Sequence, residues 1–338
     1  MNIEIISTPN DELKETGFGT LKTCEHVFRA VSEKGYRVKL SVCKNMADLE
    51  KVVKRKPDLV ILAVKYIKTK NGNNIWLSDY FATNNINYSG SSREVLRYDS
   101  DKVLAKLKLR RKGINTANFF TAIPGEHKCE EDLPLAFPLF LKPFDAANGN
   151  GVDDLSLVTN FQEFENKICS LHALYKIPVL VEAYLDGREF TVALMTSSTG
   201  ELIAAPIEIV PALSTKGLRI LGEKAKKDDS ESLRKIRDEV MKEKVKKLAM
   251  DAFINLGVRD FGRIDIKANN NGDCFFMEAN LVPGMTYGSS YFPKAWEIEY
   301  GISYDKVVDL VLEGALRRAP ASNAIEKIEV KRSMFSLA

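Results

Sequence analysis

The sequence lacks any long apolar run. No hydrophobic stretch approaches the roughly 20 residues that a helix needs to cross a bilayer. The start, MNIEIISTPN, has neither the basic region nor the extended apolar segment of a signal peptide. We therefore expect a cytoplasmic protein that has no membrane partner.

Cysteine and histidine are scarce and poorly spaced for cross-linking or metal binding. The five cysteines are an odd number without a CxxC pair, which favours free thiols over a disulfide framework or a zinc site. The three histidines, His26, His127 and His172, show no ligand spacing. A metal centre built on cysteine or histidine is therefore not expected.

A strong excess of charge is also missing. The 49 basic and 46 acidic residues leave a net charge of +3, which gives no broad field for nucleic acid. Residues 216–247 are basic but also hold seven acids, and apolar residues from Leu233 to Leu256 recur near helical spacing. This pattern predicts an amphipathic helix rather than a nucleic-acid patch. With 338 residues, the chain is expected to form two or three domains.

The first part of the chain alternates apolar strands with a helix. We predict strands at 2–7, 36–43, 58–64 and 86–90 and a helix at 20–34. This rotation is typical of a parallel sheet covered by helices, a half-Rossmann layer. No dinucleotide fingerprint follows the first strand, because GFGTLK at 17–22 lacks the third glycine, and we interpret it as a loop and a helix start.

The remaining chain predicts a smaller and a larger mixed lobe. A helix at 99–113 leads to a strand at 139–142, then come several strand pairs, and a helix at 303–316 closes the pattern. The expected fold class is α/β (α+β), with a parallel N-terminal lobe, a small central α+β lobe and a C-terminal antiparallel lobe. The expected boundaries are 1–95, 96–182, 183–320 and a tail at 321–338.

A hairpin at residues 261–286, FGRIDIKANNNGDCFFMEANLVPGMT, concentrates polar side chains on one face. Side chains alternate along strands, so Arg263 and Asp265 share a face, as do Glu278 and Asn280. A turn centred on NNNGD would place Asp265 opposite Glu278 and Arg263 opposite Asn280. The other face, with Phe275 and Met277 among its apolar residues, is expected to be core.

Two acids that face each other across a strand pair destabilise it unless a cation lies between them. Asp265, Glu278 and Asn280 offer three oxygen ligands, which suit magnesium and leave positions open for phosphate. The plain alternative is a hairpin whose acids point into solvent.

Two further stretches offer polar groups to a nucleotide. In LFLKPFDAANGNG, Lys142 ends a buried strand before a small-residue loop and could meet phosphate, although an exposed turn is an equal alternative. In VLVEAYLDGREF, Glu182 and Glu189 could flank a nucleoside, or could be surface acids of an ordinary hairpin.

The order of these motifs resembles the ATP-grasp superfamily, and within it the D-alanine–D-alanine ligase-like carboxylate–amine ligases. The resemblance runs from about residue 86 to 312, and its C-terminal motif is the most specific part. It implies the ATP-grasp fold and an ATP-dependent ligase that forms an acyl phosphate, which an amine then attacks. Amino acids would be the substrates, and a homodimer is a further implication.

The resemblance also implies site residues. Lys102, Lys142 and Lys226 would hold ATP phosphates, and Glu182, Ala183, Leu185 and Glu189 would hold adenine and ribose. Asp265, Glu278 and Asn280 would bind two Mg²⁺ ions, with Mn²⁺ as an alternative. Arg263 would stabilise the developing oxyanion, Gly284 and Ser289 would lie at the second-substrate site, and residues 212–230 would form a lid.

Departures from the family pattern lie in the phosphate loop and on the amino-acid side. Ala146, Asn148 and Gly149 replace an expected acid and hydroxyl residues, and Lys65 stands where a histidine is expected. Lys65 could pair with a substrate carboxylate or be a solvated surface lysine. A ligase for other amino acids or a peptide natural product, and a nucleotide-binding module without turnover, therefore stay open as alternatives.

Overall fold

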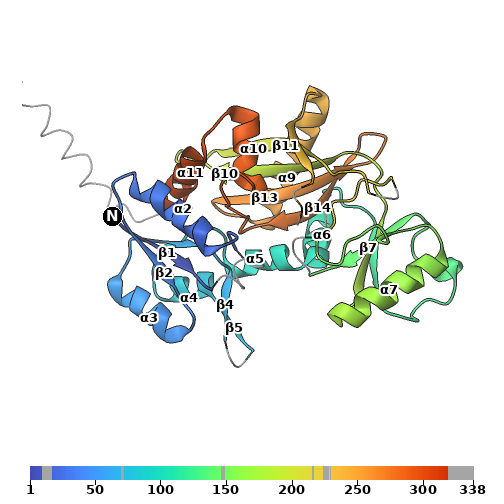
Figure 1. Ribbon diagram of the computed structural model, residues 1–338, viewed down its shortest axis with the longest axis horizontal. Coiled ribbons are helices and arrows are strands. Elements are labelled where there is room, and N and C mark those ends of the chain that lie inside the picture. Colours follow the sequence, from blue (N-terminus) through green and yellow to red (C-terminus); the bar gives the residue numbers. More distant parts are fainter. Residues whose placement is uncertain are drawn as a thin grey trace, which may run out of the picture.

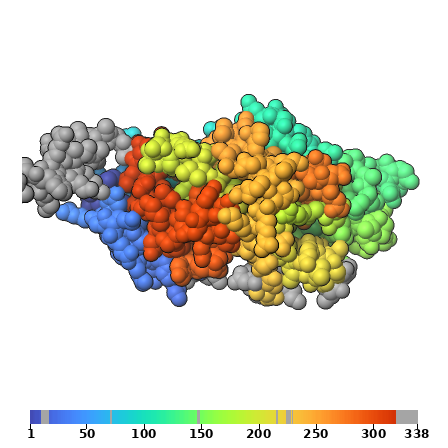
Figure 2. All heavy atoms as spheres, turned by 90° about the horizontal axis from the view of Figure 1, so that it is seen from above, coloured from blue at the N-terminus to red at the C-terminus, as the bar shows by residue number. Residues whose placement is uncertain are grey.

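The computed structural model describes residues 1–9, 17–69, 72–145, 149–214, 217–223, 228 and 230–318. Three lobes follow one another along an elongated molecule, with the N-terminal lobe at one end and the central lobe at the other (Figures 1 and 2). The C-terminal lobe lies between them. Within the described part of the chain, no helix is long and apolar enough to cross a membrane.

The N-terminal lobe is built on a three-stranded parallel sheet in the order β2-β1-β3. Strands β1 and β3 are almost wholly buried, as expected for a sheet covered by helices. The bounds are β1 Asn2–Ser7, β2 Arg37–Val42 and β3 Leu59–Leu62, helices α2 Leu21–Ser32, α3 Met46–Arg55 and α4 Leu77–Thr83, and a small hairpin of β4 Tyr66–Lys68 and β5 Asn74–Trp76.

Two predictions in this lobe have different outcomes. Thr20 caps α2 by accepting a hydrogen bond from the Thr23 N–H at 3.2 Å, so GFGTLK is indeed a loop and a helix start. The strand expected at 86–90 is wrong, because Tyr88 makes only one isolated bridge, to Val60. Gly90, with φ +81°, turns the chain away from the sheet immediately afterwards.

The helix expected at 99–113 is the shorter α6 (Lys102–Arg110), and residues 99 and 100 belong to a separate helix, α5 (Arg93–Ser100). Asp101 separates them with extended backbone angles, and its side chain caps α6 by accepting from the Leu104 N–H at 2.8 Å. Helix α6 packs on the C-terminal lobe against β14 (Cys274–Asn280) and α9 (Glu239–Leu256).

The central lobe is a four-stranded antiparallel sheet in the order β6-β9-β7-β8, with α7 packed on it. It has a hydrophobic core of its own, which includes Leu141, Phe164 and Val181. The bounds are β6 Phe119–Ala122, β7 Leu139–Pro143, β8 Leu157–Val158, β9 Val179–Ala183, α7 Phe161–Tyr175 and a short 3-10 helix Glu130–Asp132.

The C-terminal lobe is a five-stranded antiparallel sheet in the order β12-β11-β10-β13-β14. Alternate residues of β10 divide between its faces: Phe190 and Val192 lie in the core with α9, and Ala193 lies in the core with α10 and α11. The bounds are β10 Glu189–Thr196, β11 Leu202–Val210, β12 Ser232–Lys235, β13 Phe261–Ala268, β14 Cys274–Asn280, α9 Glu239–Leu256, α10 Tyr291–Tyr300 and α11 Tyr304–Leu316.

One expectation for this lobe is wrong. Leu233 does not belong to the amphipathic helix but lies in strand β12. The helix begins only after Asp238, whose carboxylate caps it by accepting from the N–H groups of Val240 and Met241.

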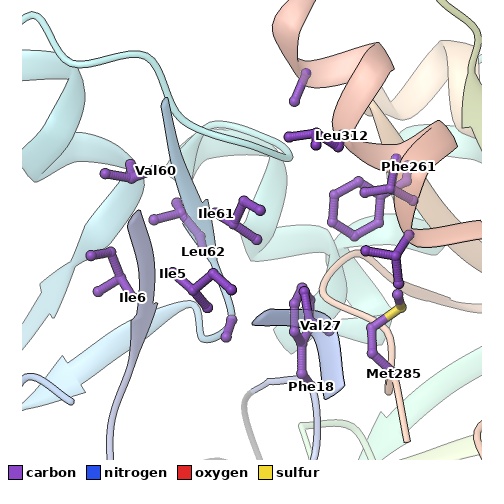
Figure 3. Close-up of a cluster of buried hydrophobic side chains, with 14 of the residues drawn as sticks. Ile5, Ile6, Phe18, Val27, Val60, Ile61, Leu62, Phe261, Met285 and Leu312 are labelled. Carbon is purple, nitrogen blue, oxygen red and sulfur yellow. The ribbon is translucent and has the colours of Figure 1, made fainter. Parts of the chain in front are cut away.

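The N-terminal and C-terminal lobes share one hydrophobic core. Figure 3 shows side chains of β1 and β3, such as Ile5 and Ile61, in one cluster with Phe261 of β13 and Leu312 of α11. The two lobes are therefore joined by continuous apolar packing, whereas the central lobe packs on its own core. The domain boundaries at residues 95, 182 and 320 stay a prediction.

Candidate active site

The hairpin of β13 and β14 has the predicted register at its polar end. Asp265 lies opposite Glu278, and Arg263 lies opposite Asn280. Towards the turn the register shifts by one, so that Ile266 pairs with Phe276 and Met277 is the extra residue of a β-bulge.

The bulge changes which face the aromatic side chains occupy. Phe276 is completely buried, whereas Phe275 and Met277, which were expected to be core, are only partly buried. Met277 instead lines a cleft between two of the lobes. The expectation was wrong because strict alternation does not hold across an inserted residue.

Asp265 is the centre of a hydrogen-bond network on the sheet surface. Arg263 binds it in a bidentate arrangement, with Nε 3.0 Å from Oδ1 and Nη2 3.0 Å from Oδ2. The Thr191 hydroxyl donates to Oδ1 at 2.6 Å, and Asn280 Nδ2 donates to Oδ2 at 3.1 Å. Burial lowers the pKa of Arg263, but the ion pair with Asp265 outweighs it and the pKa is raised.

Glu278 has a cation of its own. Its Oε2 lies 3.4 Å from Nζ of Lys102, the first residue of α6. The like charges of Asp265 and Glu278 are thus each compensated by a basic side chain that the family resemblance assigns to phosphate or oxyanion binding.

The donor atoms at this end of the hairpin fit a hard divalent cation. Within the described ranges, no three histidine, cysteine, aspartate or glutamate side chains gather as a metal cluster. The candidate set is two carboxylates and one amide, Asp265, Glu278 and Asn280, from two adjacent cross-strand pairs. Carboxylate and amide oxygens are the ligands that Mg²⁺ prefers, and an incomplete protein set leaves room for phosphate oxygens.

A cleft of about 900 Å³, partly open to solvent, lies between the central and C-terminal lobes. Eight of the predicted site residues line it: Lys102, Lys142, Glu182, Ala183, Leu185, Glu189, Asp265 and Glu278. Arg263 and Asn280 join this set through their hydrogen bonds to Asp265. Lys226, the predicted lid lysine, lies outside the described residues, as do Ala146 and Asn148.

A buried ion triplet forms one wall of the cleft. The Glu182 carboxylate lies 2.6 Å from Nζ of Lys142 and 2.6 Å from Nζ of Lys106, which the sequence analysis missed. Burial raises the pKa of Glu182, but the two lysines outweigh it and lower the pKa to about 2. Lys106 follows Lys102 by four residues and so lies on the same side of α6, a spacing that could have pointed to it.

The rest of the cleft combines an apolar slot with a second ion pair. Phe140 stacks on Tyr184 with a centroid separation of 6.4 Å, and Met277 and Leu185 add apolar surface. Lys267, also missed, places Nζ 3.2 Å from Glu189 Oε2. Such a slot suits a flat aromatic base, and the polar pair suits a sugar.

Gly149 and Val152, which follow the strand of Lys142, lie against the described part of the predicted lid. Gly149 has φ +74°, and a Cβ there would lie 3.1 Å from the Gly222 carbonyl carbon. The Glu223 N–H donates to the Val152 carbonyl at 3.1 Å, and Ile220 and Leu221 line the cleft. The described part of residues 212–230 therefore covers one side of the cleft.

Gly284 and Ser289 lie in a loop outside the described lining of this cleft. A Cβ at Gly284 would meet Ser290 Oγ at 2.8 Å, and that hydroxyl accepts from the Thr286 N–H at 2.8 Å. Ser289 itself is exposed. The Met285 N–H donates to the Phe18 carbonyl at 2.9 Å, so the loop lies against the N-terminal lobe.

Tyr291, which follows this loop, is a further neighbour of the site that the sequence analysis missed. Its ring centroid lies 5.1 Å from the Arg263 guanidinium, and its hydroxyl donates to Glu231. Burial and the Glu231 carboxylate both raise the pKa of Tyr291. The tyrosine therefore stays neutral and supports the arginine by stacking.

Lys65 is not a solvated surface lysine, so that alternative is wrong. It is only 6% exposed, and its Nζ lies 2.7 Å from Asp99 Oδ1. Asp99 Oδ2 accepts hydrogen bonds from the N–H groups of Leu281 at 2.6 Å and Val282 at 3.3 Å, directly after Asn280. The pair thus ties the N-terminal lobe to the end of β14.

A known protein family shares the part of the chain that builds this cleft. Residues 109–313 match the family model described as D-ala D-ala ligase C-terminus, which is more than half of the chain. The chain belongs to this family. The match contains β7, β9, β13 and β14 and therefore most of the cleft.

Individual relatives agree with the family match. A D-alanine–D-alanine ligase of Aquifex aeolicus is 29% identical over 295 residues, covering 87% of this chain and 94% of the relative. D-alanine–D-alanine ligase B of Clostridium perfringens is 27% identical over 301 residues, covering 88% and 94%.

A solved structure extends the fold comparison to nearly the full length. The D-alanine–D-alanine ligase from Bacillus anthracis complexed with ATP has a TM-score of 0.72, with 24% identity, 97% of this chain covered and 99% of that chain. This likeness confirms the predicted ATP-grasp fold of a D-alanine–D-alanine ligase-like protein.

Proposed function

We propose that the protein is an ATP-dependent ligase that joins the carboxylate of an amino acid to an amine through an acyl phosphate. Membership of the D-ala D-ala ligase C-terminus family supports this proposal. The observation that carries it is the convergence of Lys102, Lys142, Asp265 and Glu278 on one cleft. The Bacillus anthracis ligase was solved as a complex with ATP, which supports ATP as the nucleotide.

In this proposal the predicted site residues of the cleft have defined roles. The apolar slot and the polar atoms of Glu182 and Glu189 hold adenine and ribose. Lys102 and Lys142 bind the phosphates, and Lys226 is proposed to join them from the lid. Asp265, Glu278 and Asn280 would hold two Mg²⁺ ions, which supply neutralisation of charge on the β- and γ-phosphate oxygens.

The reaction requires an electrostatic partner for developing negative charge. An amino-acid carboxylate attacks the γ-phosphorus, ADP leaves, and an amine then attacks the acyl phosphate and expels phosphate. Arg263, fixed by Asp265 and Tyr291, is proposed to stabilise the oxyanion. A closed lid excludes water, which would otherwise hydrolyse the acyl phosphate.

We propose that the amine substrate binds near Gly284 and Ser289, where the C-terminal lobe meets the N-terminal lobe. D-alanine is the first substrate to test, because the relatives are named D-alanine–D-alanine ligases. We also propose that the protein is cytoplasmic, that it can form a homodimer and that the lobe boundaries lie at residues 95, 182 and 320.

A direct assay separates this proposal from its alternatives. The protein is incubated with ATP, Mg²⁺ and a panel of amino acids, with and without hydroxylamine, while ADP and new amides are measured. ADP release that depends on the amine and yields a dipeptide supports the ligase, and D-alanine alone sufficing would name the product.

Other results point elsewhere. Dipeptide formation only with other amino acids would assign a different ligase of the same kind. A stable phosphate ester without amine stimulation would indicate a kinase, and ATP binding without turnover on any acid would indicate a nucleotide-binding module.

A further inference from the structure

Lys106 is a fully buried lysine beside the nucleotide cleft. Its relative exposure is 0%, and it is not among the residues that line the cleft. Nζ lies 2.6 Å from Glu182 Oε1 and donates to the Phe276 carbonyl at 3.1 Å. It also lies 5.9 Å from the centroid of the Phe276 ring. A buried ammonium requires such partners because its burial is energetically costly, and the complete burial of Lys106 therefore needs an explanation.

Glu182 has two counter-ions that differ in access. Lys142 Nζ lies 2.6 Å from Oε2 and lines the cleft, so a phosphate group can reach it. Lys106 binds the other oxygen from the protein interior. If ATP phosphates draw Lys142 towards them, Glu182 loses one of its two partners, and a buried carboxylate left alone is strongly unfavourable.

We propose that Lys106 is a positioning residue for the nucleotide, which holds Glu182 in place while Lys142 moves to the phosphates. Because Lys106 stays paired with Glu182, the phosphates do not have to compete with Glu182 for Lys142. Lys106 also keeps Glu182 a fixed hydrogen-bond acceptor, which suits a base with an exocyclic amino group. The inference rests on the proposed function, because it assumes that Lys142 binds phosphate.

The surroundings of Glu182 support this division of tasks. Its cross-strand neighbours are Phe119 on β6 and Phe140 on β7, neither of which can compensate a charge. The lysines therefore carry the compensation, and the lowered pKa of Glu182 agrees with a permanently ionised carboxylate.

The first experiment compares Lys106→Met with the wild type in steady-state kinetics. We expect KM for ATP to rise by about tenfold or more, because Lys142 must then leave Glu182 unpaired to bind phosphate. We expect kcat to change by less than about threefold, since no reacting atom is touched. The preference for ATP over inosine triphosphate, which lacks the amino group, is expected to fall.

A matched control removes another lysine that pairs with a buried glutamate. Lys242 Nζ lies 2.6 Å from Glu299 Oε1, and neither residue lines the cleft. Lys242→Met should lower stability but leave KM for ATP and the nucleotide preference unchanged. An equal rise of KM in both variants would assign the effect to general destabilisation and overturn the inference.

A double-mutant cycle with Glu182→Gln gives the decisive comparison. In the Glu182→Gln background there is no carboxylate that Lys142 could leave unpaired when it binds phosphate, so adding Lys106→Met should change KM for ATP by less than about threefold. The same factor in both backgrounds would overturn the inference. If Lys106→Met alone does not fold, binding of a non-hydrolysable ATP analogue is compared between Glu182→Gln and the double variant. This comparison stays informative because the double variant buries no lone carboxylate.

These outcomes are separable from failure of the proposed function. If the wild type forms no amide from ATP and any amino acid, the ligase assignment fails. If the wild type is active but Lys106→Met keeps its KM and its nucleotide preference, the assignment stands and the role of Lys106 fails.

Discussion

Thr191→Val tests whether the hydroxyl beside Asp265, the proposed metal ligand, contributes to function. Thr191 is fully buried on β10, opposite Asp265, and its Oγ1 donates to Asp265 Oδ1 at 2.6 Å. Valine keeps the shape of the side chain and removes only this donor. A hydrogen bond to a charged acceptor contributes about 1.5–3 kcal/mol.

The lower end of that range applies here, because Asp265 keeps its bonds to Arg263 and Asn280. A loss of about 1.5 kcal/mol corresponds to an approximately tenfold higher Mg²⁺ concentration for half-maximal activity. At saturating Mg²⁺ we expect kcat to recover to within about threefold of the wild type.

Two measurements check this prediction. The first is initial rate against free Mg²⁺, and the second is urea unfolding without metal. The loss of about 1.5 kcal/mol is divided between the two, because a hydrogen bond lost equally with and without metal lowers only the free energy of unfolding. Thr196→Val is the matched control, since Thr196 pairs with Leu202 at the opposite end of the same strand. Wild-type Mg²⁺ dependence together with wild-type stability in Thr191→Val would refute the reasoning.

Three further predictions address the charges of the site. Glu278→Gln should abolish turnover while circular dichroism shows an intact fold, and near-normal turnover would contradict the metal assignment. The pKa of Glu182, lowered from 4.5 to about 2, contributes up to about 3 kcal/mol to the free energy of unfolding above pH 4.5, and this contribution is lost as pH falls towards 2. Acid unfolding curves should therefore show a smaller loss of stability in Glu182→Gln than in the wild type. Asp99→Asn should lower the free energy of unfolding, measured in urea, by about 3 kcal/mol because it leaves Lys65 buried and unpaired. The Lys65→Met, Asp99→Asn double variant should recover part of that loss, and no recovery would exclude the pair as the cause.

The predicted pairing of Asp265 with Glu278 shows what the turn residues can predict about strand register. The turn residues and the alternation of side chains predicted the correct partners at the polar end of the hairpin. The inward face of β14 was predicted wrongly, because a β-bulge depends on packing against other elements and leaves no simple sequence pattern. Phe276 instead of Met277 enters the core for this reason.

The residues that sequence reasoning missed act through partners distant in the chain. Lys106 on α6 meets Glu182 on β9, which lies far along the chain in another lobe. Thr191 meets Asp265 through a strand pairing whose partners are 74 positions apart in the sequence. Family motifs predicted the cleft residues, whereas these supporting contacts required the tertiary structure.

The single core that joins the first and last lobes has a consequence for making fragments of this protein. Residues of β1 and β3 pack with Phe261 and Leu312 in one cluster. A recombinant piece that ended after the first parallel sheet would present that apolar surface to water and would aggregate. The excised central lobe keeps its own apolar interior and is the better candidate for expression alone.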